Sequence, residues 1–520
     1  MLFIHDISRT EIRLLARKWP NIPSDKKEEF IDKIIEVLKQ HSMPFNFWTL
    51  SIFLWIFSGK NTLNFNNNSE LIELYIDDLL DRNRLASDPQ NRFSYQNYKL
   101  LLSELAYELL MNYRDTNYSI KYSELMVFTE AFMRKNPKRV GITSEVVYYL
   151  LHKGVLKKMD NDLVTFRLNG VFEYFIAYSF NENTDLLDTI IQDENVYLSF
   201  KNGFEIYSGF PRSASENKHF MKTIFEKTKA VFKELNDRMT GELDFRLNSS
   251  IEGKELLDLS EPIKQITQAE GISPLTDEEK DQFYNENNLA PISTSEVKSK
   301  KVYDVSVKDC EILERYLLIN GRVFRNIENI NDKKLINEIF DFMIEASCNF
   351  GFALIEELEQ SNLEEQTETL KTNIKQLILQ LFNNYLPIVV QGFLSDAMGN
   401  INLEAIIKEK INLYKVDYRN NQYKLFILYS LLLDVDLKRY KHYLDELTQI
   451  ARMGIIKSSV LLKLCNLLML KSYDDDAMIS FLKEKIREMS LMINPKTDMK
   501  QFDRKFEKTY KALLLKRQLK

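Results

Sequence analysis

The sequence predicts a mainly α-helical protein with one short β-hairpin, followed by helices that form an irregular α-solenoid. Hydrophobic residues make up 44% of the 520 residues and charged residues 28%, a balance typical of folded chains. The 14 glycines and 11 prolines leave room for long uninterrupted helices. Apolar residues recur at helical spacing along most of the chain, and we expect about two to four domains.

Residues 1–90 are predicted to form a domain of short helices. Pro44 disfavours helical geometry at the residue before it and can begin the next helix, which carries the apolar run 47–57. That run would span about 16 Å as a helix, roughly half of a membrane's hydrocarbon core, so we expect a buried helix. A further helix is predicted over residues 70–80, with Asp77 and Asp78 on its solvated face.

Residues 91–182 are predicted to form a second domain, in which three helices precede a hairpin and a closing helix. Ser144 is the expected cap of the third helix, and Gly154 its end. The hairpin then turns at residues 159–162. This order is that of a winged helix. The predicted elements are helices over 98–113, 122–134, 144–152 and 171–180, and strands over 155–158 and 163–168.

The remainder is predicted to be helical apart from one linker. Residues 183–240 form a helical connector. Residues 241–305 contain prolines, glycines and mixed charges with few aromatics, which is typical of a flexible linker or long loop. In residues 306–520 helices recur at a steady cadence, with separate helices expected over 334–345 and 352–358. Antiparallel helix pairs would form an irregular α-solenoid, whose surface suits the binding of a protein.

Charge gives no support for nucleic-acid binding. The 70 basic and 76 acidic residues leave a formal net charge of -6 and are scattered along the chain. The third helix of the expected winged helix is the one that would enter DNA. Its sequence, TSEVVYYLLHK, has one lysine and no arginine to meet base edges. We therefore do not expect nucleic acid as a partner.

The sequence shows neither a catalytic constellation nor a metal-binding one. A nucleotide-hydrolysing P-loop needs GxxxxGK[ST], and the nearest string, SGKNT at residues 58–62, lacks the first glycine and has Asn61 in place of the hydroxyl residue. The histidines show no HxxxH or HExxH spacing, and the cysteines no CxxC spacing. The acidic trio at residues 474–476 precedes a helix, and we interpret it as a cap. We expect neither enzyme activity nor a metal.

The expected location is the cytoplasm, without a membrane segment. His5, Asp6, Arg9 and Glu11 interrupt the N-terminal stretch, so it does not read as a signal peptide. The three cysteines are odd in number and far apart, which does not support a disulfide framework and fits a reducing compartment.

Residues 166–180, FRLNGVFEYFIAYSF, carry the most specific pattern in the chain. This pattern resembles the phrase F-R-H-x-S-F-Q-E-Y-F-A-A that closes the winged-helix domain of bacterial NACHT-type STAND NTPases. Residues 197–212, YLSFKNGFEIYSGFPR, are similar to the segment that follows in the same proteins. The proline-led helix with the helix at 70–80 resembles their helical domain. Residues that match the phrase position by position are Phe166, Arg167, Glu173, Tyr174, Phe175 and Ala177.

The resemblance covers residues 1–240 and implies the regulatory region of a STAND NTPase, with a helical domain, a winged helix and a helical sensor but no P-loop ATPase core. It implies bacterial antiphage defence, in which residues 306–520 recognise a protein ligand such as a phage protein and the winged helix relays that event to an ATPase-bearing chain. ATP or ADP would enter only with such a core, and Pro44 would then pack near the adenine. Leu168 stands where the family often has a phosphate-binding histidine, and leucine has no donor.

Two other interpretations stay open. The chain could be a stand-alone helical scaffold that joins protein partners without nucleotide control. A DNA-binding regulator would need basic residues on the helix before the hairpin, which are absent. An upstream coding sequence with GxxxxGK[ST] and an acidic Walker B strand would favour signalling over a scaffold.

Overall fold

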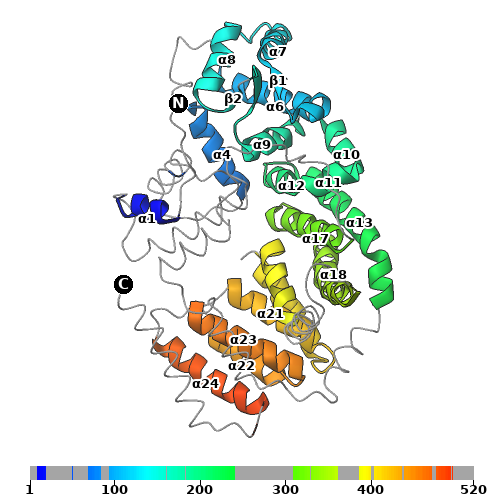
Figure 1. Cartoon of the computed structure of the whole chain (residues 1–520). Coiled ribbons are helices and arrows are strands. Elements are labelled where there is room, and N and C mark those ends of the chain that lie inside the picture. Colours follow the sequence, from blue (N-terminus) through cyan, green and yellow to red (C-terminus); the bar gives the residue numbers. More distant parts are fainter. Residues whose placement is uncertain are drawn as a thin grey trace, which may run out of the picture. The chain divides into compact units, whose positions relative to one another are not determined.

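The computed structural model describes residues 9–18, 50, 68–82, 93–159, 161–181, 183–239, 309–327, 329–360, 386–399, 403–435, 439–470, 476–493 and 495. These residues are mainly α-helical, and their β-sheet is small, three-stranded and antiparallel (Figure 1). The predicted mainly α fold with a short hairpin is therefore confirmed. The described residues divide into two compact units, of which the first ends at Ser213 and the second begins at Ala214.

The first unit contains α1 (Arg9–Lys18) and α4 (Asn68–Leu79), the latter close to the helix predicted over residues 70–80. The buried side chains of α4 follow the spacing i, i+3, i+4, i+7 of one helix face. They are Ile72, Tyr75, Ile76 and Leu79. The apolar run 47–57 lies outside the described residues except for Leu50, which is helical and buried. The predicted linker at residues 241–305 also lies outside them.

Residues 93–181 contain the sheet, whose strands lie in the order β1-β3-β2 with both pairs antiparallel. In this register Ile120 pairs with Val164 and Leu156 with Phe166. The predicted helices and hairpin are present, and β1 adds a strand that the sequence did not predict. In chain order the elements are α6 (Tyr95–Asn112), β1 (Ile120–Lys121), α7 (Tyr122–Arg134), α8 (Thr143–His152), β2 (Leu156–Lys158), β3 (Leu163–Phe166) and α9 (Asn169–Ser179).

The two ends of α8 differ in how well they were predicted. Gly154 follows the helix as expected, with a φ of +73° that suits glycine. Ser144 is not the cap, and that prediction was wrong. The extended residue Ile142 takes the N-cap position, and its carbonyl accepts a hydrogen bond from the Val146 amide at 3.0 Å. The helical ladder thus begins early enough to include Ser144 in its first turn.

α9 is central to the core of the first unit. It is apolar on nearly every side, and a helix of this kind must be covered all round. Both α6 and α12 (Lys201–Ser208) pack against it. The Phe166 ring lies 5.3 Å from Phe172 and 5.9 Å from Phe175, measured between ring centroids. The FRLNGVFEYFIA pattern is thus largely a packing sequence. Two further helices, α10 (Thr184–Gln192) and α11 (Glu194–Ser199), lie between α9 and α12 in the chain.

The second unit is helical throughout its described part. Many of its helices pack on their neighbours in the chain, α13 with α17 and α18, α20 with α21, α21 with α22, and α23 with α24. The helices are α13 (Ala214–Met239), α17 (Asp309–Asn326), α18 (Lys333–Gln360), a helix over residues 386–398, α20 (Glu404–Lys415), α21 (Gln422–Val435), α22 (Tyr440–Ile450), α23 (Gly454–Leu470) and α24 (Asp476–Ile493).

α18 is one continuous helix where the sequence predicted two, over 334–345 and 352–358. The prediction was wrong because packing overrides the low helix propensity of Gly351. A Cβ atom at Gly351 would lie 2.7 Å from a Leu386 methyl carbon and 2.9 Å from a Val390 methyl carbon. Glycine therefore allows the helix over residues 386–398 to approach α18 closely.

We expect the substitution Phe175→Ala to lower the free energy of unfolding by about 3–5 kcal/mol, because it empties a fully buried site among aromatic rings. Denaturant unfolding followed by circular dichroism measures the loss. Val127→Ala is the control, since Val127 is 67% exposed and its loss should change stability by less than about 0.5 kcal/mol. Equal effects of the two substitutions would contradict the central role of α9.

Candidate functional site

The residues that the sequence connected with nucleotide or metal chemistry do not make up a site in the described part of the structure. Pro44, the SGKNT string at 58–62 and two of the three residues at 474–476 lie outside it. Among the described residues, no group of three or more His, Cys, Asp or Glu side chains could hold a metal ion. The three cysteines are buried and form no disulfide, and burial raises the pKa of Cys348 and Cys465 to about 12.

Leu168 lies at the position where the related phrase has its histidine, and Arg167 precedes it. Leu168 is buried just before α9, and its carbonyl accepts a hydrogen bond from the Phe172 amide at 3.1 Å. Arg167 is exposed, and its guanidinium lies against Gly154, where an added Cβ would be 2.8 Å from Nη1. The two side chains alternate between the faces of the chain, as predicted. The buried face at this position therefore offers no donor to a nucleotide phosphate.

A shallow hollow of about 360 Å³ lies between α6 and α7. Its lining includes the carboxylates of Glu108 and Glu124 beside the apolar side chains of Val127 and Phe128. Tyr113 donates a hydrogen bond to Glu124 at 3.3 Å, and burial together with this carboxylate raises the pKa of Tyr113. Two carboxylates would repel a phosphate, so this hollow does not fit a nucleotide.

Polar contacts between distant segments of the first unit converge on α4 and the residues that follow it. Glu73 and Asp77 are four residues apart and share one stripe of the helix, and Asp81 stands just past its end. Each of the three meets a group from α6 or α8. We call this set of contacts the α4 junction, and it comprises Glu73, Asp77, Leu80, Asp81, Arg82, Tyr95, Lys99, Tyr149, Lys153, Tyr174 and Tyr178.

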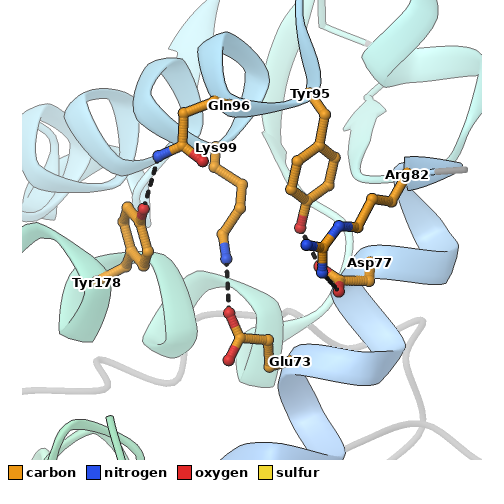
Figure 2. A network of polar contacts seen from close by, with 7 residues as sticks. All are labelled: Glu73, Asp77, Arg82, Tyr95, Gln96, Lys99 and Tyr178. Carbon is orange, nitrogen blue, oxygen red and sulfur yellow. Dashed lines mark hydrogen bonds and ion pairs between the residues drawn. The ribbon is translucent and has the colours of Figure 1, made fainter. Parts of the chain in front are cut away.

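Lys99 of α6 is the central group of the α4 junction (Figure 2). Its side chain is 5% exposed, and its ammonium nitrogen lies 2.9 Å from a carboxylate oxygen of Glu73. The same nitrogen lies 4.7 Å from the ring centroid of Tyr178, 5.4 Å from that of Tyr174 and 5.8 Å from that of Tyr95. A buried ammonium needs a counter-charge, and aromatic faces add to its stabilisation. One cation thus holds α4, α6 and α9 together.

Asp77 is the second anchor of α4 in this network (Figure 2). It accepts a hydrogen bond from the Tyr95 hydroxyl, and it pairs with Arg82 at 2.6 Å. Burial and then the hydrogen bond to Asp77 raise the pKa of Tyr95, so the phenol stays a donor. The prediction of a solvated face holds for Asp78, which is exposed, but was wrong for Asp77, because α6 approaches there and leaves its carboxylate 15% exposed.

The third part of the α4 junction joins α8 to the end of α4. The Tyr149 hydroxyl donates a hydrogen bond to the Leu80 carbonyl at 2.9 Å, and the Lys153 ammonium lies 2.7 Å from Asp81. Lys153 is the single lysine of TSEVVYYLLHK, the helix that would read DNA in a winged helix. Its charge is paired within the chain. Glu145 and Tyr148 are exposed on this helix and offer no cation to a phosphate backbone.

The α4 junction consists of ion pairs, hydrogen bonds and cation–aromatic contacts between segments, and none of its residues is a Ser, Thr, Cys or His that could act as an activated nucleophile. Its two sides differ in how well water could replace the contacts. Glu73 is 40% exposed and can be rehydrated if α4 moves away, whereas the 5% exposed Lys99 would lose its counter-charge. Moving α4 therefore carries a cost that is concentrated on Lys99.

Sequence reasoning did not single out Lys99 or Tyr95. A signal was present in the spacing, since Tyr95 and Lys99 are four residues apart, as are Tyr174 and Tyr178. Residues four apart in a helix share a face. One aromatic–cationic pair and one pair of aromatics on different helices could have indicated a shared cation site.

A family model described as Novel STAND NTPase 4 matches residues 118–176. The matched segment runs from just before β1 to near the end of α9, and it includes Tyr149, Lys153 and Tyr174 of the α4 junction. This match supports a relation to STAND NTPases and, at that coarse level, to STAND-type signalling. Comparisons with curated proteins and with solved structures gave no match. Among the described helices, none combines the length and apolar character that crossing a membrane requires.

We expect Glu73→Gln to loosen α4, because it removes the carboxylate that faces the buried Lys99. Hydrogen exchange measured by mass spectrometry should show protection of residues 72–80 falling at least about tenfold, for a local cost of about 1–3 kcal/mol. Glu130→Gln is the matched control, since Glu130 pairs with Arg134 on an exposed helix face and such pairs contribute only about 0.3–0.5 kcal/mol. Unchanged exchange in α4 would refute the anchoring role of this ion pair.

Proposed function

We propose that this chain is the regulatory and ligand-sensing portion of a STAND-type, NACHT-like signalling protein in bacterial antiphage defence. The single observation that supports it most is the family match at residues 118–176, which falls on the segment that docks against α4. In this proposal residues 1–90 form the helical domain, 91–182 a winged helix, and the C-terminal helices a sensor that recognises a protein. The site of action is the cytoplasm.

The order of elements favours a winged helix in the matched region. The chain runs α6, β1, α7, α8, β2 and β3, and the hairpin strand β3 lies between β1 and β2. In DNA-binding proteins of this kind the helix before the hairpin enters the major groove. Here Tyr149 and Lys153 of that helix bind the end of α4 instead. This use of α8 supports an internal regulatory role over DNA binding.

The α4 junction is the proposed relay. Binding of a ligand by the sensor would change how the winged helix docks on its neighbours, and a change of this kind requires two arrangements of comparable free energy. Contacts such as Glu73 to Lys99 and Asp81 to Lys153 are partly exposed on the α4 side, so water can replace them when the docking changes. Charged contacts of this kind suit a reversible interface better than a sealed apolar one.

Two places among the described residues, the Leu168 position and the hollow between α6 and α7, do not fit a nucleotide phosphate. Leu168 offers no donor, and the hollow beside Glu108 and Glu124 is acidic. ATP or ADP would therefore bind through an ATPase core carried elsewhere, and Pro44 is the proposed contact to the adenine from this chain. A contact through Pro44 would need shape rather than charge.

The alternative is a helical scaffold that joins protein partners without nucleotide control. The helical second unit is compatible with both proposals, since an irregular α-solenoid offers a protein-binding surface in either case. The two differ in whether the docking of α4 matters for output. A scaffold needs only a folded chain, whereas a relay needs the α4 junction.

The purified chain alone should neither hydrolyse ATP nor bind fluorescent ATP or ADP at micromolar concentration, with or without magnesium. The physical reason is the lack of a GxxxxGK[ST] loop to cradle phosphates. Phosphate release and fluorescence anisotropy measure the two properties. Hydrolysis of ATP by the purified chain would contradict the proposal that the ATPase core is carried elsewhere. Micromolar binding that Pro44→Ala weakens about tenfold would instead assign a nucleotide pocket to the N-terminal part of the chain.

Lys99→Met should alter signalling without unfolding the chain, because methionine fills the tyrosine-lined site and leaves only the hydratable Glu73 unpaired. We expect phage plating on bacteria that carry the chain in its natural gene context to change at least about tenfold, matching a shift of about 1.4 kcal/mol in docking. Arg134→Met, on an exposed face of α7, is the control. Normal plating with a folded Lys99→Met protein would favour the scaffold.

A further inference from the structure

Two turns of the second unit are held together by one buried side chain, Gln422. Its amide oxygen accepts hydrogen bonds from the backbone amides of Arg452 at 2.7 Å and Met453 at 3.0 Å. Its amide nitrogen donates to the backbone carbonyl of Arg419 at 3.2 Å. Gln422 is thereby committed to the backbone of two turns, residues 416–421 between α20 and α21 and residues 451–453 between α22 and α23. A rigid backbone results where two connections meet.

The side chains of these turns bring two arginines to one phenol. Arg419 and Arg452 are exposed, and each acts on the hydroxyl of Tyr418. The hydrogen bond and charge of Arg419, and then the charge of Arg452, lower the pKa of Tyr418. Two cations therefore share one neutral oxygen, an arrangement that leaves guanidinium donors for another acceptor.

No carboxylate within the described residues forms an ion pair with Arg419 or Arg452. Asp417 is near enough to raise the pKa of Arg419 after the contributions of Tyr418, and it accepts a hydrogen bond from Asn420 at 2.9 Å. By contrast, Lys415 at the end of α20 forms an ion pair, in which its ammonium nitrogen lies 2.5 Å from a carboxylate oxygen of Glu446. The positive charge of the two arginines is thus only partly compensated at this surface.

Two exposed apolar side chains precede Arg419 in the chain. Leu413 is 59% exposed and Val416 is 87% exposed, and at a spacing of three they share one side of the end of α20. Single exposed apolar residues are ordinary. Here, two of them close in the chain to Tyr418 and Arg419 add apolar area beside the residue types, tyrosine and arginine, in which interface hot spots are enriched.

We propose that this surface, made of Leu413, Val416, Tyr418, Arg419 and Arg452, docks an acidic segment of the protein ligand, with a carboxylate on the arginines and an apolar side chain on Leu413 and Val416. The inference rests on the proposed sensing function and names the chemistry of its ligand. Planar guanidinium groups match carboxylates in two parallel hydrogen bonds. Because Gln422 already fixes the backbone, binding loses little freedom of the turns.

A protein ligand fits this surface better than nucleic acid does. Binding to a phosphate backbone gains affinity from many cations in a row, and only Arg419 and Arg452 are left without an ion pair here. The exposed Val416 would gain nothing from phosphates but would be buried by an apolar side chain.

The test is selection of random displayed peptides of about twelve residues on the full chain, followed by anisotropy titration of the selected peptides. We expect Asp or Glu next to Leu, Ile or Phe to be enriched. Arg419→Glu and Arg452→Glu should each weaken binding at least about tenfold. Both keep the backbone groups that Gln422 binds, so they should fold normally. Arg487→Glu, on an exposed site of α24, is the matched control and should leave affinity unchanged.

The following outcomes would overturn the assignment. Selected peptides that are basic, or that bind the arginine variants as well as the parent chain, would do so. Binding of an oligothymidylate that both arginine variants abolish would assign the surface to nucleic acid instead. Peptides that protect other parts of residues 309–493 from hydrogen exchange would leave protein sensing intact while removing this surface. A library with no binder anywhere in the second unit would count against both proposals.

Discussion

Burial of the Lys99 ammonium is the constraint on which the arrangement of α4, α6 and α9 depends. An ammonium removed from water loses hydration that is recovered only through close partners. Glu73 supplies the opposite charge, and the rings of Tyr95, Tyr174 and Tyr178 supply negative faces. Because those partners come from three helices, none of the three can move without exposing the cation or leaving it unpaired. The packing of α9 and the docking of α4 are therefore coupled.

Pairing of a lysine with a carboxylate of the same chain also explains why α8 makes internal contacts. Lys153 would be the one lysine available to DNA, yet Asp81 takes its charge and Tyr149 binds the neighbouring backbone carbonyl. Burial, then repulsion from Asp81, raises the pKa of Asp78 beside this pair, with Lys153 acting in the opposite direction. Acidic groups thus gather at the end of α4, and they give α8 an electrostatic reason to stay there.

The spacing of apolar residues along the sequence predicted the elements of the first unit, because this spacing indicates which face of a helix is buried. It placed α4, α6, α7 and α9 and the hairpin close to where they lie, and the aromatic phrase marked the helix most deeply buried. It could not identify Lys99 or Asp77 as junction residues, because the spacing of apolar residues does not indicate which other element packs against a polar helix face. The error at Gly351 has a similar origin, since the reason for glycine lies on a helix more than 30 residues away.

Charges that are paired inside the molecule and charges that are left for a partner can be told apart by the backbone that carries them. Lys99 lies on α6 and meets Glu73 of α4, so its role is completed within the fold. Arg419 and Arg452 lie on turns whose backbone is held by hydrogen bonds from the buried Gln422. The guanidinium groups themselves interact with the Tyr418 hydroxyl. Ordering a surface turn costs conformational entropy that no internal contact of the arginines recovers. Contacts with a bound partner would offset this loss of conformational entropy. The rigid, cationic surface beside Val416 therefore favours recognition of a partner.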